Sequence, residues 1–287
     1  MLTKASRLSI ESRNLRKSTV VIIRCSISSG YRPRKIRKEV LLTFISPETP
    51  LEAAATQSPD AIKISRLVFS YPGKNSAAIL DIPYWQIRQG ERIFLHGPSG
   101  SGKSTLLNLL AGILTTAQGS IEILGQNLSA LSTRQRDRFR ARRIGIVFQQ
   151  FNLIPYLNVF DNVRLAAYFG NKENTKIEQK TLQLFAALGL DRSILNKQTN
   201  ALSVGQQQRV AIARALINSP EILIADEPTS ALDNDARAAF MQLLTNVCRN
   251  QRSTLIFVSH DTSLAQHFQR IVDLTTLNHT GTAIHAC

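Results

Sequence analysis

The nine residues 97–105, GPSGSGKST, constrain the fold of this chain more than any other segment. They follow a short apolar stretch, ERIFLH, that predicts a buried strand, and they open a stretch, KSTLLNLLAG, that predicts a helix. A glycine-rich turn between a strand and a helix allows several backbone N–H groups to point at one anion, with the positive end of the helix behind them. The segment therefore predicts an α/β fold with a phosphate-binding turn at the edge of its sheet.

The side chains of this turn narrow the ligand to a nucleoside triphosphate. Lys103 supplies a point charge to the β- and γ-phosphates, Ser104 can ligate Mg²⁺, and Thr105 can hydrogen-bond the α-phosphate. We expect the whole turn to contact the nucleoside triphosphate: Gly97, Pro98, Ser99, Gly100, Ser101, Gly102, Lys103, Ser104 and Thr105.

Two further apolar stretches end in polar side chains suited to phosphate chemistry. ILIADEP, residues 222–228, predicts a buried strand that finishes in Asp226 and Glu227. Asp226 can hold Mg²⁺ through water, and Glu227 can orient or deprotonate the attacking water. TLIFVSHD, residues 254–261, predicts a second strand that ends at His260, which can stabilise charge on the γ-phosphate. Alone, each feature is common at strand ends; beside the turn they predict hydrolysis.

A second anion-binding turn lies in LSVGQQQRVAIARAL, residues 202–216, where Ser203 and Gly205 begin a predicted helix. The set GPSGSGKST, LSVGQQQRVAIARAL, ILIADEPTSALD and VSHD, in this order, strongly resembles the ATP-binding cassette ATPases over about residues 61–277. The resemblance implies that two cassettes pack head to tail, so that Ser203, Gly205 and Gln206 of one copy complete the ATP site of the other. Each site then needs dimerisation, and ATP controls the association of the pair.

The resemblance also assigns roles to three other residues. It implies that Tyr71 stacks on adenine, that Gln149 meets Mg²⁺ and the attacking water and links the cassette to a membrane partner, and that Asp233 lies in a loop crossing the dimer interface. Gln150 leaves the register of the glutamine open. Val204 departs from the family, which has glycine there, and its β-branch restricts the backbone of the turn.

Alternating strands and helices predict an α/β domain at residues 59–287, with a mostly parallel sheet covered by helices on both faces. Early alternating strands predict a small antiparallel sheet, and residues 132–215 predict a helical insertion. Residues 1–58 carry 11 Lys/Arg against 4 Asp/Glu and predict a basic, disordered extension and linker. An organelle transit peptide is the alternative for this segment.

Composition limits the remaining classes. No stretch approaches 18 consecutive apolar residues, so no membrane span is predicted, and three cysteines without CxxC spacing argue against a disulfide framework or zinc site. The resemblance implies ATP and Mg²⁺ as ligands, a second copy of the chain and separate membrane subunits as partners, and a place at the cytoplasmic face of the membrane. The form of the cassette is most similar to ATPases of the lipoprotein-release and macrolide-export type.

Two alternatives stay open at this stage. A net charge of +15 is compatible with a soluble cassette ATPase acting on nucleic acid or ribosomes. Such relatives usually carry a coiled-coil insertion, zinc cysteines or two cassettes, whereas Gln149 and Ser203 are only 54 positions apart here. A binding module without activity would not need Lys103, Glu227 and His260 together.

Overall fold

The computed structural model divides the chain into two compact units, Met1–Gln57 and Ser58–Cys287. The first unit is described only at its strands. In the second, the structure describes residues 59–73, 77–170, 176–230, 232 and 234–280. The site residues predicted from the sequence belong to the second unit, so the first is described briefly and by itself.

Three strands form in the first unit, where the sequence predicted none. β1 (Leu8–Leu15), β2 (Ser18–Cys25) and β3 (Val40–Phe44) pair antiparallel in the order β1-β2-β3. The central strand reads STVVIIRC, and its run of β-branched residues favours extended backbone. The basic composition of residues 1–58 predicted disorder instead.

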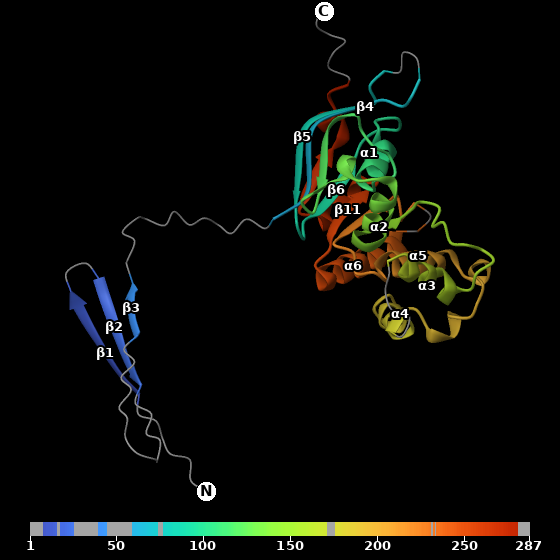
Figure 1. Cartoon of the computed structure of the whole chain (residues 1–287). Coiled ribbons are helices and arrows are strands. Elements are labelled where there is room, and N and C mark those ends of the chain that lie inside the picture. Colours follow the sequence, from blue (N-terminus) through green and yellow to red (C-terminus); the bar gives the residue numbers. More distant parts are fainter. Residues whose placement is uncertain are drawn as a thin grey trace, which may run out of the picture. The chain divides into compact units, whose positions relative to one another are not determined.

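A parallel sheet forms the centre of the second unit (Figure 1). Its order is β12-β6-β11-β10-β9, and each neighbouring pair is parallel. The strands are β6 (Arg92–His96), β9 (Ile144–Val147), β10 (Ile222–Asp226), β11 (Thr254–Val258) and β12 (Arg270–Asp273). β10 and β11 are almost wholly buried, as expected for parallel strands with both faces covered.

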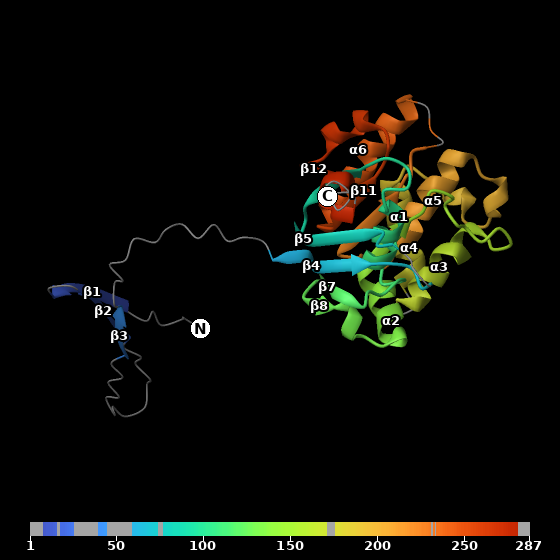
Figure 2. The ribbon, with the colours of Figure 1, turned by 90° about the horizontal axis from the view of Figure 1, so that it is seen from above.

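A four-stranded antiparallel sheet, in the order β5-β4-β7-β8, lies at one end of this unit, and helices α3 to α5 lie towards the other (Figures 1 and 2). The strands of this antiparallel sheet are β4 (Asp60–Phe69), β5 (Leu80–Arg88), β7 (Gln118–Ile123) and β8 (Gln126–Asn127). The alternating patterns of β4 and β5 bury one face of each strand, which confirms the predicted antiparallel side sheet.

The helices follow the predicted order. They are α1 (Lys103–Leu110), α2 (Thr133–Arg143), α3 (Val159–Phe169), α4 (Ile177–Ala187), α5 (Val204–Leu216), α6 (Asn234–Gln251) and the short α7 (Leu274–Leu277). Short 3₁₀ turns occupy Leu128–Ala130, Arg192–Ile194, Thr199–Ala201 and Thr262–His267. Reciprocal hydrogen bonds between N-cap and third helical residue begin α2 (Ser132 with Gln135) and α5 (Ser203 with Gln206).

The predicted helical insertion at residues 132–215 needs one correction. It contains β9, which pairs with β10 and so belongs to the parallel sheet. The four residues IGIV are too short for a recognisable strand pattern, and they follow directly on the arginine-rich helix α2.

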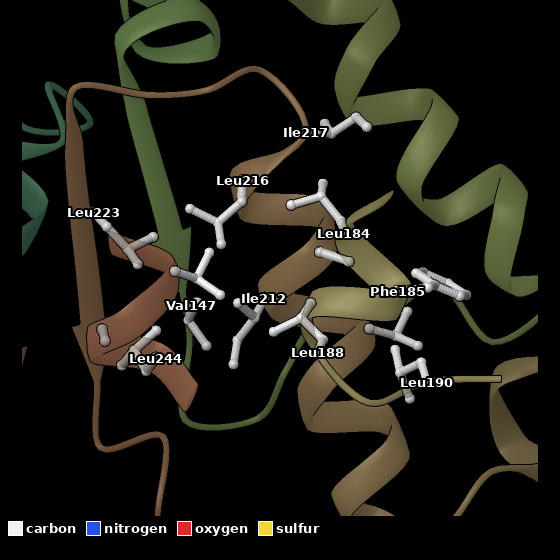
Figure 3. Packing of buried hydrophobic residues seen from close by; sticks show 14 of the residues in the cluster. Val147, Leu184, Phe185, Leu188, Leu190, Ile212, Leu216, Ile217, Leu223 and Leu244 are labelled. Atoms are coloured by element: carbon white, nitrogen blue, oxygen red, sulfur yellow. The ribbon is translucent and has the colours of Figure 1, made fainter. Parts of the chain in front are cut away.

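Two hydrophobic clusters cover the two faces of the parallel sheet. On β6, Phe94 belongs to one cluster while Ile93 and Leu95 belong to the other, because successive strand residues point to opposite faces. In the first cluster, α5 lies between the sheet and α4 (Figure 3). Ile212 of α5 lies between Val147 of β9 and Leu188, the residue that follows α4. Helix α5 is therefore packed against the sheet that carries the site.

Candidate active site at the carboxyl edge of the sheet

Four parallel strands place the predicted catalytic residues at one edge. The register aligns Val258 of β11 with both Leu95 of β6 and Asp226 of β10, and it aligns Ala225 with Val147 of β9. The segments that leave this edge begin at residues 97, 148, 227 and 259. They carry the phosphate-binding turn, Gln149, Glu227 and His260, so a single edge brings together residues far apart in sequence.

The phosphate-binding turn ends at Gly102, which caps α1 with φ +96° and no side-chain hydrogen bond. A Cβ at this position would lie 2.8 Å from Leu80 Cδ2, so only glycine fits both the backbone and the space. Lys103 Nζ donates to the carbonyl oxygens of Gly97 (2.7 Å) and Pro98 (2.8 Å) and thus folds over the turn. Pro98, Ser99, Gly100 and Ser104 are exposed, Gly97, Ser101, Gly102 and Lys103 are half-buried, and Thr105 is buried.

Asn278 holds the turn from the end of the described chain. Its Nδ2 donates to the Ile79 carbonyl at 2.9 Å and to the Ser101 carbonyl at 3.4 Å, and its Oδ1 accepts from the Asp81 N–H at 2.8 Å. Inside the turn, Ser101 Oγ is buried without a hydrogen-bond partner. A buried hydroxyl without a partner suits a turn that is built to meet an oxygen-rich ligand.

Asp226, at the end of β10, has the surroundings of a cation ligand. Burial raises the pKa of its carboxyl above the usual range, the neighbouring Glu227 charge adds to the rise, and the Lys103 ammonium opposes it. A divalent cation beside the carboxylate would offset both the burial and the Glu227 charge. Ser104 offers a hydroxyl at the start of α1, so the oxygen donors expected for Mg²⁺ are present.

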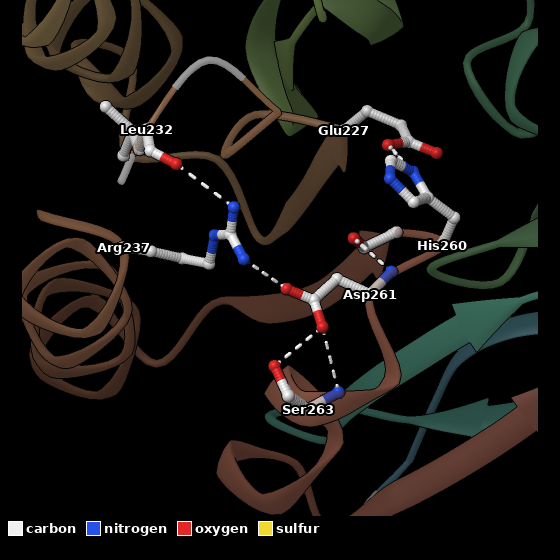
Figure 4. A network of polar contacts seen from close by, with 7 residues as sticks. Glu227, Leu232, Arg237, His260, Asp261 and Ser263 are labelled. Atoms are coloured by element: carbon white, nitrogen blue, oxygen red, sulfur yellow. Dashed lines mark hydrogen bonds and ion pairs between the residues drawn. The ribbon is translucent and has the colours of Figure 1, made fainter. Parts of the chain in front are cut away.

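Glu227 and His260 are in direct contact. Glu227 has a left-handed backbone with φ +47°, and its N–H donates to the Val258 carbonyl at 2.9 Å. Its Oε2 lies 2.6 Å from Nδ1 of His260, whose side chain is 71% exposed (Figure 4). The predicted general base and the histidine predicted to stabilise charge on the γ-phosphate are therefore one hydrogen-bonded pair.

Tyr71 lies beside the start of α1, as an adenine contact requires. Its hydroxyl is 3.3 Å from Oγ1 of Thr105, and its ring packs edge-on against Phe69 with centroids 5.2 Å apart. The ring is 43% exposed and borders a cavity of about 490 Å³. A partly exposed aromatic ring thus lies close to the phosphate-binding turn.

Gln149 is exposed in the turn after β9, and Gln150 is exposed beside it. The two following residues, Phe151 and Asn152, both have φ of +50°. Arg214 of α5 donates to both of their carbonyl oxygens, at 2.6 Å for Phe151. No role was predicted for Arg214, although its charge within the apolar helix pattern VAIARAL is a signal that could have indicated one.

The second predicted anion site begins α5 and is separate from the first turn. Ser203 Oγ accepts from the Gln206 N–H at 3.3 Å, and Gln206 Oε1 accepts from the Ser203 N–H at 3.1 Å. Ser203 and Val204 are exposed, and a Cβ at Gly205 would meet nothing within 4 Å. α5 itself packs on α3, α4 and β9. Asp233 lies outside the described residues.

Within the described ranges, no helix has the length and hydropathy to cross a bilayer, and no group of three or more His, Cys, Asp or Glu side chains forms a metal cluster. Among the described residues, the predicted cation ligands remain Ser104, Gln149 and Asp226.

Comparison with known proteins agrees with this geometry. The profile of the ABC transporter family matches residues 80–230. The lipoprotein-releasing system ATP-binding protein LolD of Pseudomonas syringae pv. tomato is 38% identical over 202 residues, covering 70% of this chain and 88% of that protein. The uncharacterised ABC transporter ATP-binding protein MJ0796 of Methanocaldococcus jannaschii is 40% identical over 191 residues, with 66% and 81% covered.

Solved structures show the same architecture. A dimeric post-hydrolysis state of the cassette MJ0796, bound to ADP and Pi, has a TM-score of 0.68 at 35% identity and covers 76% of this chain and 95% of that one. CbiO1 of Clostridium perfringens, part of an ABC transporter complex, has a TM-score of 0.67 at 28% identity, with 75% and 84% covered. The predicted fold is confirmed, and the chain belongs to the ABC transporter family as one of its ATP-hydrolysing cassettes.

Proposed function

We propose that the chain is the ATPase subunit of a transporter of the lipoprotein-release type, acting as a dimer on the cytoplasmic face of a membrane through separate membrane subunits. The likeness to LolD over 88% of that protein supports the type, and the dimeric structures of MJ0796 support the dimer. The relatives described above give no support to the nucleic-acid alternative.

In the proposed reaction, a water oxygen attacks the γ-phosphorus of ATP and ADP leaves. Glu227 accepts the proton of the attacking water, and His260 keeps that carboxylate in place through the 2.6 Å contact of its Nδ1. Lys103 and the backbone N–H groups at the start of α1 bind the phosphates, and Gln149 helps to orient the water. Mg²⁺, held by Ser104 and Asp226 with Gln149 nearby, would neutralise phosphate charge when bound.

The other half of each ATP site is proposed to come from the second copy. The exposed Ser203 hydroxyl and the Gly205 N–H stand at the start of α5, where the helix dipole favours an anion. Gln206 forms the two capping hydrogen bonds with Ser203, and these bonds fix the turn in which a phosphate would bind. Val204 points its side chain into solvent with 49% exposed, so its β-branch fits the first helical position of this turn.

Exposed aromatic side chains beside α3 support docking of a membrane subunit. Tyr156, Tyr168 and Phe169 are 79%, 68% and 61% exposed. A hollow of about 480 Å³ is lined by Leu157, Asp161, Arg164, Leu165 and Tyr168. Large aromatic residues exposed together indicate a protein interface, and this one follows the segment that carries Gln149.

The contact of Glu227 with His260 carries the proposal, and Glu227→Gln tests it. The glutamine amide cannot accept the proton, so kcat should fall at least a hundredfold while ATP still binds. With Mg²⁺ and ATP, the variant should elute as a dimer in size-exclusion chromatography. Glu221→Gln, at the opposite end of β10, is the matched control and should keep wild-type turnover. Rapid hydrolysis by Glu227→Gln, or a monomer at saturating nucleotide, would contradict the proposal.

A further inference from the structure

One arginine joins the loop expected at the dimer interface to the catalytic histidine. Arg237, near the start of α6, donates through Nη2 to the carbonyl oxygen of Leu232 at 3.0 Å. Its Nη1 forms an ion pair with Oδ2 of Asp261 (Figure 4). Leu232 belongs to the segment Ser230-Ala231-Leu232-Asp233, and Asp261 directly follows His260.

Both carboxylate oxygens and the backbone N–H of Asp261 form hydrogen bonds, so this residue can transmit a displacement. Its other oxygen, Oδ1, accepts from the N–H (3.0 Å) and the Oγ (2.6 Å) of Ser263. Its own N–H donates to Ser259 Oγ at 3.1 Å. The hydrogen bonds from Ser263 are the main cause that lowers the pKa of the Asp261 carboxyl, and Arg237 lowers this pKa further. Asp261 therefore stays charged. His260 therefore directly precedes a residue that several hydrogen bonds hold in place.

The position of His260 in turn decides where the base lies. His260 Nδ1 contacts Glu227 Oε2, and Ser230 N–H donates to the Glu227 carbonyl at 3.3 Å. The interface segment thus contacts the base directly at one end and, through Arg237 and Asp261, the histidine at the other. A guanidinium is suited to this bridge because its rigid planar fork serves two acceptors at once.

We propose that Arg237 is a positioning residue that transmits dimer closure to the hydrolytic pair Glu227 and His260, an inference that rests on the proposed function. When the partner presses on Ser230 and Leu232, the carbonyl of Leu232 and the carboxylate of Asp261 move as one unit. Hydrolysis then begins only when both copies are docked.

Folding stability alone does not account for the ion pair between Arg237 and Asp261. About a quarter of each side chain is exposed, and ion pairs near the surface contribute little to folding stability. Arg237 Nε is buried without a hydrogen-bond partner, so the side chain loses solvation to keep its two terminal contacts. Such an arrangement orders two segments relative to each other more than it stabilises the fold.

The test compares Arg237→Gln and Asp261→Asn with Arg249→Gln, a control on the exposed end of the same helix. Full-length Arg237→Gln should lower kcat about tenfold, leave KM for ATP within twofold, and melt within about 3 °C of wild type. Arg237→Gln with Asp261→Asn should lose no more than the worse single variant, since both remove one contact. Arg249→Gln should match wild type.

A dimer measurement separates positioning from simple loss of structure. In the Glu227→Gln background, adding Arg237→Gln should leave the dimer trapped by Mg²⁺ and ATP intact, because binding precedes the step that Arg237 controls. Loss of the trapped dimer, unchanged kcat in Arg237→Gln, or additive effects of the pair would each overturn the inference. Failure of Glu227→Gln alone to trap a dimer would instead count against the proposed function.

Discussion

Replacing Arg214 by methionine should slow hydrolysis by loosening the loop that carries Gln149. Methionine keeps most of the apolar length of the side chain but removes both donors to the carbonyls of Phe151 and Asn152. Both of these residues have left-handed backbone at φ +50°, which costs about 1–2 kcal/mol for a residue other than glycine. The arginine therefore offsets strain that the loop carries by itself.

The size of the effect follows from the two bonds. A hydrogen bond to a charged group contributes about 1.5–3 kcal/mol, and partial exposure of Arg214 places each bond at or below the low end of this range. A net loss of about 2 kcal/mol would reduce the share of correctly placed loops about thirtyfold. We expect kcat to fall between tenfold and thirtyfold, with KM for ATP changed much less.

The assay is steady-state ATP hydrolysis by the full-length protein, with thermal unfolding measured in parallel. Arg209→Met is the matched control, because Arg209 lies on the same helix and donates to the carbonyls of Leu188 (3.5 Å) and Gly189 (3.3 Å) in a different loop. Its kcat should stay within twofold of wild type. Equal losses in both variants, or a wild-type kcat for Arg214→Met, would refute the reasoning.

Two other predictions concern charge and domain organisation. Because the folded-state pKa of Asp226 is raised, the stability linked to its proton is lost as pH rises through that pKa; Asp226→Asn should raise Tm at pH 7 without nucleotide, and the gain should shrink towards pH 4. A gain of equal size at both pH values in calorimetry would contradict this. Deleting residues 1–58 should preserve ATPase activity, since every proposed site residue lies beyond them; a folded but inactive truncation would show that the extension takes part.

Local sequence patterns predicted the strands and turns that carry the site, because each is a continuous apolar run with a polar end. β9 was missed for a reason that is visible in the packing. A Cβ at Gly145 would lie 2.6 Å from the Ala215 carbonyl, so glycine is needed there for close approach of α5. That requirement comes from a helix about seventy residues later in the chain, and the sequence pattern around Gly145 contains no sign of it.

The residues that hold the site in place could not be predicted in the same way. Arg214 and Asn278 donate to backbone carbonyls of distant segments, and any residue type at the accepting position supplies the same oxygen. Arg237 joins the nearby Leu232 carbonyl to Asp261, which lies 24 residues later. Apart from the charge of Arg214 within an apolar helix pattern, no side-chain pattern marks these contacts. By contrast, Lys103, Glu227 and His260 were predictable because each follows an apolar run that must end at the sheet edge.

The connection of the phosphate-binding turn to Asn278 has a consequence for synthesis on the ribosome. β6, which leads into that turn, gains its two neighbours only with β11 and then β12, at residues 254–258 and 270–273. Asn278, which donates to the Ser101 carbonyl, emerges later still. In a nascent chain that ends before these residues, the backbone N–H and C=O groups along both edges of β6 are unpaired and the turn lacks its contact to Asn278, so we expect this chain to be prone to aggregation until translation passes them.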